Sequence, residues 1–98
     1  MGNLFEVVKR RLGIAEAITV YDDDIQLYIE DCKQDMIASE VPKTVVDAET
    51  PAVATAVYLY VAAHLWEDKT DTEKSLALYR QKVSRLTLEP DGSEENVD

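Results

Sequence analysis

One stretch of the sequence decides the fold: residues 50–66 read TPAVATAVYLYVAAHLW. Thr50 followed by proline is a strong helix start, because the threonine side chain caps free amide groups and proline is tolerated in the first turn. Beyond that start, the only clearly polar side chains are Thr55 and His64. We therefore expect a helix over about residues 51–68 that is apolar on every side and must be covered on every side.

Length and charge restrict what this helix belongs to. The chain has 98 residues, the size of a single domain. The apolar helix is too short and too rich in tyrosine for a membrane span, which needs roughly 20 apolar residues. The net charge is −10, which argues against binding to nucleic-acid phosphates or to an anionic membrane surface. A single cysteine, Cys32, excludes an internal disulfide and suits a reducing compartment.

Three further helices are predicted from apolar residues at spacings of three and four. The first ends at Gly13, a suitable stop. The second starts at Asp22, Asp23 and Asp24, where an aspartate can cap the helix. The last opens with a capping-box pattern from Thr70. The predicted ranges are residues 3–12, 22–39 and 71–86.

The remaining segments are predicted to be irregular. Residues 39–50 cannot form one regular helix because Pro42 interrupts them, and a brief extended stretch at Val45 and Val46 is an option. A connection of this length also suggests a contact loop. Residues 89–98 have five acids and no core-forming residue, so we expect a disordered acidic tail after a single helical domain at residues 1–88.

The predicted fold is therefore all-α, a small bundle of three to four helices around the central apolar helix. Three helices hide two or three sides of a fourth, so one apolar side is expected to be exposed and to bind a partner. The residues expected in the core or at a subunit interface are Val53, Val57, Tyr58, Tyr60, Val61, Leu65 and Trp66.

No catalytic, cofactor or metal site is predicted. The three aspartates lack the glycine and distal glutamate of a calcium loop, so helix capping is the better interpretation. His64 has no second histidine to complete a metal site, and Cys32 fits an inert core thiol. A carrier-type protein would attach a prosthetic arm to a serine in an Asp-Ser-Leu sequence, but Lys74 precedes Ser75.

Two stretches resemble the head-tail connector (adaptor) proteins of tailed bacteriophages, a family also described as DNA-packaging proteins. Residues 22–32 resemble the opening of that family's long helix. Residues 50–69 match its proline-started apolar helix, which ends in Ala-His, an aromatic residue, an acid and a base. The closing Leu-Tyr-Arg at residues 78–80, with Leu86 behind it, also fits, so the resemblance covers about residues 3–88.

This resemblance implies a structural protein without enzymatic activity. It implies a subunit that assembles with itself into a ring under the phage portal protein. Assembly would take place in the host cytoplasm, and the subunit would reside in the neck of the finished virion. The ring would receive the next neck or tail-completion protein, and DNA would pass through its acidic channel without specific binding. Basic residues of the last helix, Arg80, Lys82 and Arg85, are expected to contact the portal.

Two alternatives stay open from the residues themselves. One is an acidic helical interaction or regulatory module that binds a basic protein. The other is a carrier-type protein loaded at Ser75.

Overall fold

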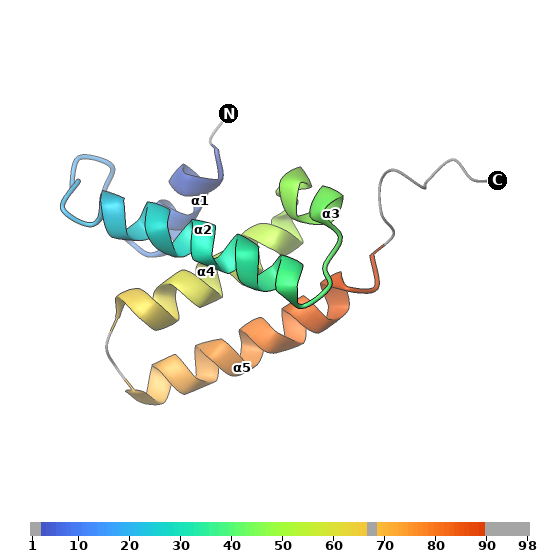
Figure 1. The fold of residues 1–98 in the computed structure, drawn as a ribbon. Helices are drawn as coiled ribbons and strands as arrows, with labels where there is room; N and C mark the ends of the chain where they lie inside the picture. Colours follow the sequence, from blue (N-terminus) through green and yellow to red (C-terminus); the bar gives the residue numbers. More distant parts are fainter. Residues whose placement is uncertain (1–2, 67–68, 90–98) are drawn as a thin grey trace.

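The computed structural model describes residues 3–66 and 69–89, with the side chains of residues 69–71 outside the description. These residues form helices and no strand, so the predicted all-α fold is confirmed (Figure 1). The predicted disordered tail falls almost entirely on residues 90–98, which lie outside the described residues. The helices are α1 (Leu4–Arg11), α2 (Asp22–Ala38), α3 (Lys43–Ala48), α4 (Pro51–Leu65) and α5 (Lys69–Leu86).

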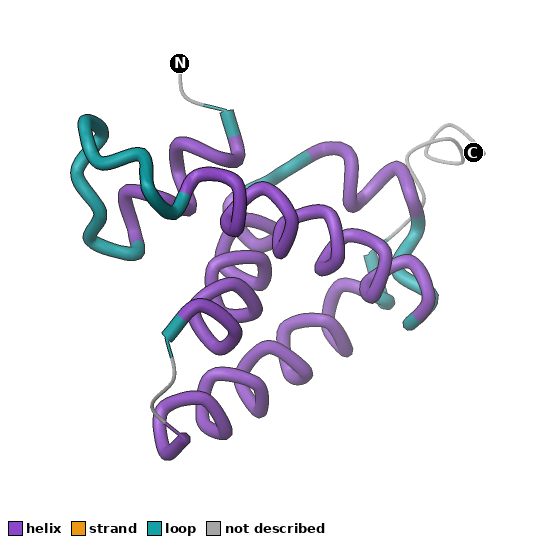
Figure 2. Tube along the Cα trace, turned by 60° about the vertical axis from the view of Figure 1, so that its left-hand side comes forward, coloured by secondary structure: helices purple, strands orange, loops and turns teal. Residues whose placement is uncertain are grey.

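The apolar helix α4 lies at the centre of the fold, as expected. It contacts all four of the other helices, and Val53, Val57 and Val61 along it are fully buried. α5 runs antiparallel to α4 along its length, while α2 crosses the other side of α4 (Figures 1 and 2). The bundle is thus arranged around one apolar rod.

α4 begins as the sequence predicts and ends earlier. The Thr50 hydroxyl oxygen accepts a hydrogen bond from the backbone N–H of Val53 at 3.4 Å. The helix ends at Leu65, and Trp66 is extended with a ψ of 133°. Thr72 of α5 then donates to the backbone carbonyl of Trp66 at 3.3 Å. This contact ties the start of α5 to the end of α4.

α1 has the predicted stop. Gly13 adopts a φ of +82°, a left-handed conformation that glycine reaches without a side-chain clash. Its backbone N–H bonds to the carbonyl of Arg10 at 3.0 Å, which satisfies a carbonyl at the helix end. At the other end the Asn3 side chain accepts from the N–H of Glu6 at 2.9 Å.

The prediction that an aspartate caps α2 is wrong. The residue at the cap position is Tyr21, which makes no side-chain capping bond, and the three aspartates form the first helical turn. Negative charge is still favourable there because it faces the positive end of the helix dipole. Asp22 has a second task, since its Oδ1 lies 2.9 Å from the Nζ of Lys9 in α1.

The extended stretch suggested at Val45 and Val46 is also wrong, because residues 43–48 form the short helix α3. Proline ends a helix that reaches it from before, but it does not prevent a new helix from starting directly after it. Pro42 stands immediately before α3, and Val46 is fully buried against the core. The burial of this one side chain offsets the low intrinsic stability of so short a helix.

α5 begins at Lys69, two residues before the predicted start. The capping bond predicted for Thr70 concerns a side chain outside the described ones. Along the helix, Tyr79, Val83 and Leu86 are buried against the core, as their spacing predicts. None of the described helices is both long and apolar enough to cross a membrane.

Candidate interaction surfaces

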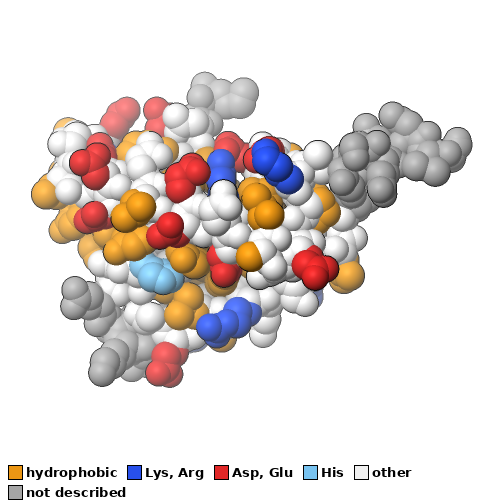
Figure 3. Space-filling model, viewed as in Figure 1, with side chains coloured by type: hydrophobic (Ala, Val, Ile, Leu, Met, Phe, Trp, Pro, Cys, Tyr) orange, Lys and Arg blue, Asp and Glu red, His pale blue; other side chains and the backbone are white. Residues whose placement is uncertain are grey.

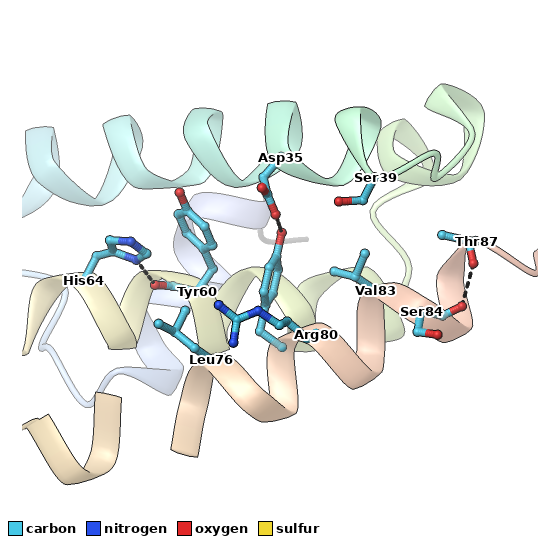
Figure 4. Close-up of a pocket in the computed structure, with 10 residues that line it drawn as sticks. Asp35, Ser39, Tyr60, His64, Leu76, Arg80, Val83, Ser84 and Thr87 are labelled. Carbon is cyan, nitrogen blue, oxygen red and sulfur yellow. Dashed lines mark hydrogen bonds between the residues drawn. The ribbon is translucent and has the colours of Figure 1, made fainter. Parts of the chain in front are cut away.

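A groove of about 550 Å³ lies between α2 and α5. Tyr60 and His64 of α4 line the groove between the other two helices. Across it, Asp35 of α2 faces Tyr79 and Arg80 of α5 (Figure 4). We call it the α2–α5 groove. It is bridged in its middle by side chains rather than open along its whole length.

The bridge is a hydrogen-bonded chain of three residues. The Tyr79 hydroxyl donates to Asp35 Oδ2 at 2.6 Å and accepts from the thiol of Cys32 at 3.7 Å. Cys32 is fully buried, and Tyr79 is nearly so. Because these bonds link α2 to α5 over the top of α4, they fix the width of the groove.

Burial sets the ionisation of this cluster. It raises the pKa of the Cys32 thiol to about 12, and it raises the pKa of the Tyr79 phenol as well, helped by the neighbouring thiol and by Asp35. The pKa of Tyr60 is also raised, first by burial and then by Asp31. The thiol and both phenols are therefore neutral at neutral pH, so this cluster packs helices and supplies no ready nucleophile.

His64 is placed as its position in the sequence suggests. It is exposed on the helix face, and its Nδ1–H donates to the carbonyl oxygen of Tyr60 at 2.8 Å. Its ring stacks on the ring of Tyr60 with centroids 4.3 Å apart and lies 5.5 Å from that of Tyr28. The histidine thus forms part of an aromatic cluster at the mouth of the groove.

A second groove, of about 370 Å³, lies on the other side of α4 against α5. Its apolar lining comes from Tyr58, Ala62, Trp66 and Leu78. Trp66 is 39% exposed and Leu78 is 43% exposed, so their apolar surfaces meet solvent. We call it the Trp66–Leu78 groove. It is a side of α4 that the rest of the described chain leaves partly uncovered.

Basic side chains border the Trp66–Leu78 groove. Lys74 of α5 lines it directly, and Arg11 of α1 lies over the ring of Tyr58 with 5.0 Å from its Cζ to the ring centroid. Arg11 Nη1 also donates to the Thr55 hydroxyl at 2.9 Å, which holds the guanidinium at the groove's edge. The groove therefore has an apolar floor, the hydroxyl groups of Thr72 and Ser75 in its wall, and Lys74 and Arg11 as cations at its edge.

The seven residues expected in the core or at an interface divide by their depth. Val53, Val57 and Val61 are fully buried inside the chain. The half-buried ones are Tyr58, Tyr60 and Leu65, and Trp66 is exposed. The short helix α3 covers part of α4 in addition to the three predicted helices, so the free side is smaller than those three alone would leave. Only the tyrosines, Leu65 and Trp66 therefore present apolar surface to a partner.

The model of the phage connector protein family matches residues 4–93 of the sequence. That range includes every helix described above. The chain belongs to the phage connector protein family. Searches among curated proteins and among solved structures found no match.

Membership supports a role in the connection between the head and the tail of a phage, as the sequence resemblance implied. Connectors of this kind are structural proteins, so their surfaces carry their function. The two grooves of this connector-family chain are therefore best treated as candidate contacts with other proteins of the particle.

The three basic residues expected to contact the portal do not share one face of this connector chain. Arg80 lines the α2–α5 groove. Lys82 is two residues further along the helix, about 200° around its axis, and leaves on the opposite flank. Arg85 is exposed on the same flank as Lys82. The helical spacing of the three residues already indicates this division, which the sequence-based expectation did not use.

The structure gives no support for a metal site or for a carrier-type protein. Within residues 3–66 and 69–89, no group of three His, Cys, Asp or Glu side chains is placed to hold a metal ion. Ser75 is half-buried in the Trp66–Leu78 groove and lies in the second turn of α5. A serine that receives a prosthetic arm stands exposed at a helix start, so the carrier hypothesis is disfavoured.

Sequence reasoning missed the exposed Leu27 and Leu78 and the buried Lys9. Leu78 falls between the basic residues of the last helix, and Leu27 falls between acids of the second, so neither belongs to the apolar stripe of its helix. A count of the charges three and four residues from each leucine is the signal that would have singled them out.

Proposed function

We propose that this chain is a head-tail connector subunit that assembles with itself into a ring beneath the portal. The ring extends the DNA channel and provides the platform for the next neck or tail-completion protein. The observation that carries the proposal is the family match over residues 4–93. Because that match takes in the whole helical fold, the proposed role belongs to the folded unit and not to an appended segment.

Exposed apolar surface supports self-assembly. Trp66 and Leu78 are both more than a third exposed beside half-buried Tyr58, and aromatic residues of this kind are enriched where proteins associate. A ring of identical subunits would cover such a surface on every copy without leaving a free end.

Net charge supports the passage of DNA. A charge of −10 per chain, repeated around a ring, produces a negative field that repels phosphates at short range. The genome would then move through the channel without adhering to its wall.

Contact with the portal is proposed for the basic side chains of α5. Arg80, Lys82 and Arg85 are all exposed and are among the few cations in a strongly acidic chain. An acidic or carboxylate-bearing surface on the portal would complement them.

The test uses the full chain alone and mixed with purified portal particles. Multi-angle light scattering and negative-stain electron microscopy should reveal rings, either free at high concentration or attached to the portal. An unrelated acidic helical protein of similar size, mixed with the same portal, serves as the control. A chain that stays monomeric throughout and ignores the portal, or that instead captures one host protein in a pull-down, would refute the proposal.

A further inference from the structure

An exposed leucine on α2 stands inside a frame of acids. Leu27 is 57% exposed, and the four positions that neighbour it on the helix surface, three and four residues away on each side, are all acidic. These residues are all exposed and comprise Asp23, Asp24, Glu30 and Asp31. None of them forms an ion pair with a cation in the described parts of the chain.

The Trp66–Leu78 groove carries the complementary pattern. Leu78 is 43% exposed, and the residues four before and four after it on α5 are Lys74 and Lys82, both exposed. Arg11 adds a third cation where it lies over Tyr58. These cations form no ion pair with any acid of the described residues. An apolar centre with a positive rim thus matches an apolar knob with a negative rim.

Leu27 points away from the Trp66–Leu78 groove of its own chain, although the start of α2 reaches that groove where the ring of Tyr21 lies 5.7 Å from that of Trp66. α2 packs on the side of α4 that carries Tyr60, and Leu27 lies on the face of α2 opposite its buried residues. Tyr58 is two residues from Tyr60 on α4, so it leaves the helix about 200° around the axis, toward the other groove. Figure 3 shows the acidic side chains spread over the surface that α2 forms. One chain therefore cannot join its own two patches.

We propose that Leu27 and its acidic frame dock into the Trp66–Leu78 groove of a second copy of this chain. This inference rests on the proposed self-assembly and names the two faces that meet. Contact between unlike patches is head-to-tail, and it closes into a ring when the rotation per subunit allows. Acid-to-acid and base-to-base pairings repel, so the charges select this orientation over a two-fold dimer.

The contact also divides the cations of α5 between two partners. Lys74 and Lys82 face the neighbouring copy, with Arg85 on the same flank as Lys82, and Arg80 remains for the portal. This division follows from their places around the helix: Lys74 and Lys82 are four residues to either side of Leu78, whereas Arg80 lines the α2–α5 groove.

Charge reversal tests the pairing. One variant carries Glu30→Lys and Asp31→Lys, and another carries Lys74→Glu and Lys82→Glu. Each should raise the protein concentration needed for half-assembly at least about tenfold, because like charges then face each other across the contact. A chain with all four substitutions should assemble again. A Glu6→Lys, Glu16→Lys variant, whose exposed acids lie outside the frame, changes the net charge by the same amount as the Glu30 and Asp31 reversal and should assemble normally.

Light scattering reports assembly, and circular dichroism melts check that every variant is folded. If the wild type assembles and both reversals assemble equally well, the pairing is wrong while the ring proposal stands. A wild type that never assembles, alone or with portal, refutes the ring and this contact together. Loss of portal binding with assembly unchanged in the Lys74 and Lys82 variant would assign the groove to the portal and overturn the pairing.

Discussion

At the scale of single residues, the side chains that matter most are those with no access to solvent. Val57 and Cys32 are both fully buried, one in the middle of α4 and the other on the face of α2 that packs against it. A charge placed at either position has no water to stabilise it and no side chain of opposite charge in contact. Their environments therefore determine both the stability and the pH response of the fold.

Val57→Asp should unfold the chain. An unpaired carboxylate in this site costs about 4 kcal/mol or more, which is comparable with the whole stability of a domain of this size. Thermal melts followed by circular dichroism measure it. Ala52→Asp, at an exposed position in the first turn of the same helix, is the matched control and should melt like the wild type. A cooperative, wild-type melt of the Val57 variant would show that its side chain does not lie in the core.

Cys32 should make stability fall at alkaline pH. Burial raises the pKa of its thiol to about 12 from an ordinary value of 9.0, so the folded state keeps the proton that the unfolded state releases. The contribution is fully present below pH 9 and is lost as pH rises toward 12, by at most about 1.4 kcal/mol for each pH unit. Urea unfolding at a series of pH values measures this loss.

Cys32→Ala provides the comparison for that series, since Tyr79 also has a raised pKa and remains in both proteins. The variant should lose less stability between pH 9 and 12 than the wild type does. Equal losses in the two proteins would mean that folding does not raise the pKa of the thiol. In line with the raised pKa, a thiol reagent should label native Cys32 at pH 8 only after denaturant is added.

At the scale of elements, the helices are set by their ends and their connections. Thr50 caps α4 through Val53, and Gly13 ends α1 in a left-handed conformation. The connection between α1 and α2 is held by Lys9, which is 5% exposed, pairs with Asp22 and donates to the carbonyl of Glu16 at 3.1 Å. The ion pair is a close charge contact that lacks ideal hydrogen-bond alignment at Asp22 Oδ1.

Thr50→Ala should destabilise the chain by about 1 kcal/mol, because a free N–H at the start of α4 loses its acceptor. Thr50→Ser keeps the hydroxyl and should be close to neutral. Urea denaturation of the two variants beside the wild type gives the difference. If alanine and serine have the same effect, the 3.4 Å contact contributes nothing to the cap.

Asp22→Asn should cost about 2 kcal/mol, because it leaves the nearly buried ammonium of Lys9 without its carboxylate. The side chain of Asp22 is 29% exposed, so solvent reduces the loss below that of a fully buried pair. Asp23→Asn, one residue along on an exposed position, is the control. Equal denaturation midpoints for the two variants would contradict a structural role for the ion pair.

At the scale of the whole molecule, the distribution of charge and of apolar surface gives the chain two unlike faces. Acids border Leu27 on α2, and bases border Trp66 and Leu78 on the far side of α4. A net charge of −10 makes random association unfavourable, so only a surface with local complementarity brings copies together. The proposed directional contact and the proposed ring both rest on this arrangement.

Assembly should be visible in the fluorescence of Trp66, which is the single tryptophan of the chain. It is 39% exposed in one subunit, so its burial by a neighbour should shift the emission to the blue and reduce quenching by acrylamide. A dilution series followed by fluorescence and light scattering compares the two signals. Oligomers that form with no change in emission would place the contact away from this groove.

The sequence by itself determined the all-α class, the central position of α4 and the burial of its valines. It could do so because a helix that is apolar on every side is stable in water only when other segments of the protein surround it. The end at Gly13 and the cap at Thr50 were likewise local, since each depends on backbone bonds within a few residues.

Only the tertiary structure decided which surfaces remain. The cap of α2, the helix at Lys43–Ala48 and the pairing of Lys9 with Asp22 each depend on contacts between distant segments. The Trp66–Leu78 groove has the same origin, because α4 shows no apolar stripe by which one side could be chosen as the free one. Which side of α4 is buried depends on how the other helices pack against it. Because α4 is apolar on every side, its own sequence does not indicate which side those helices leave uncovered.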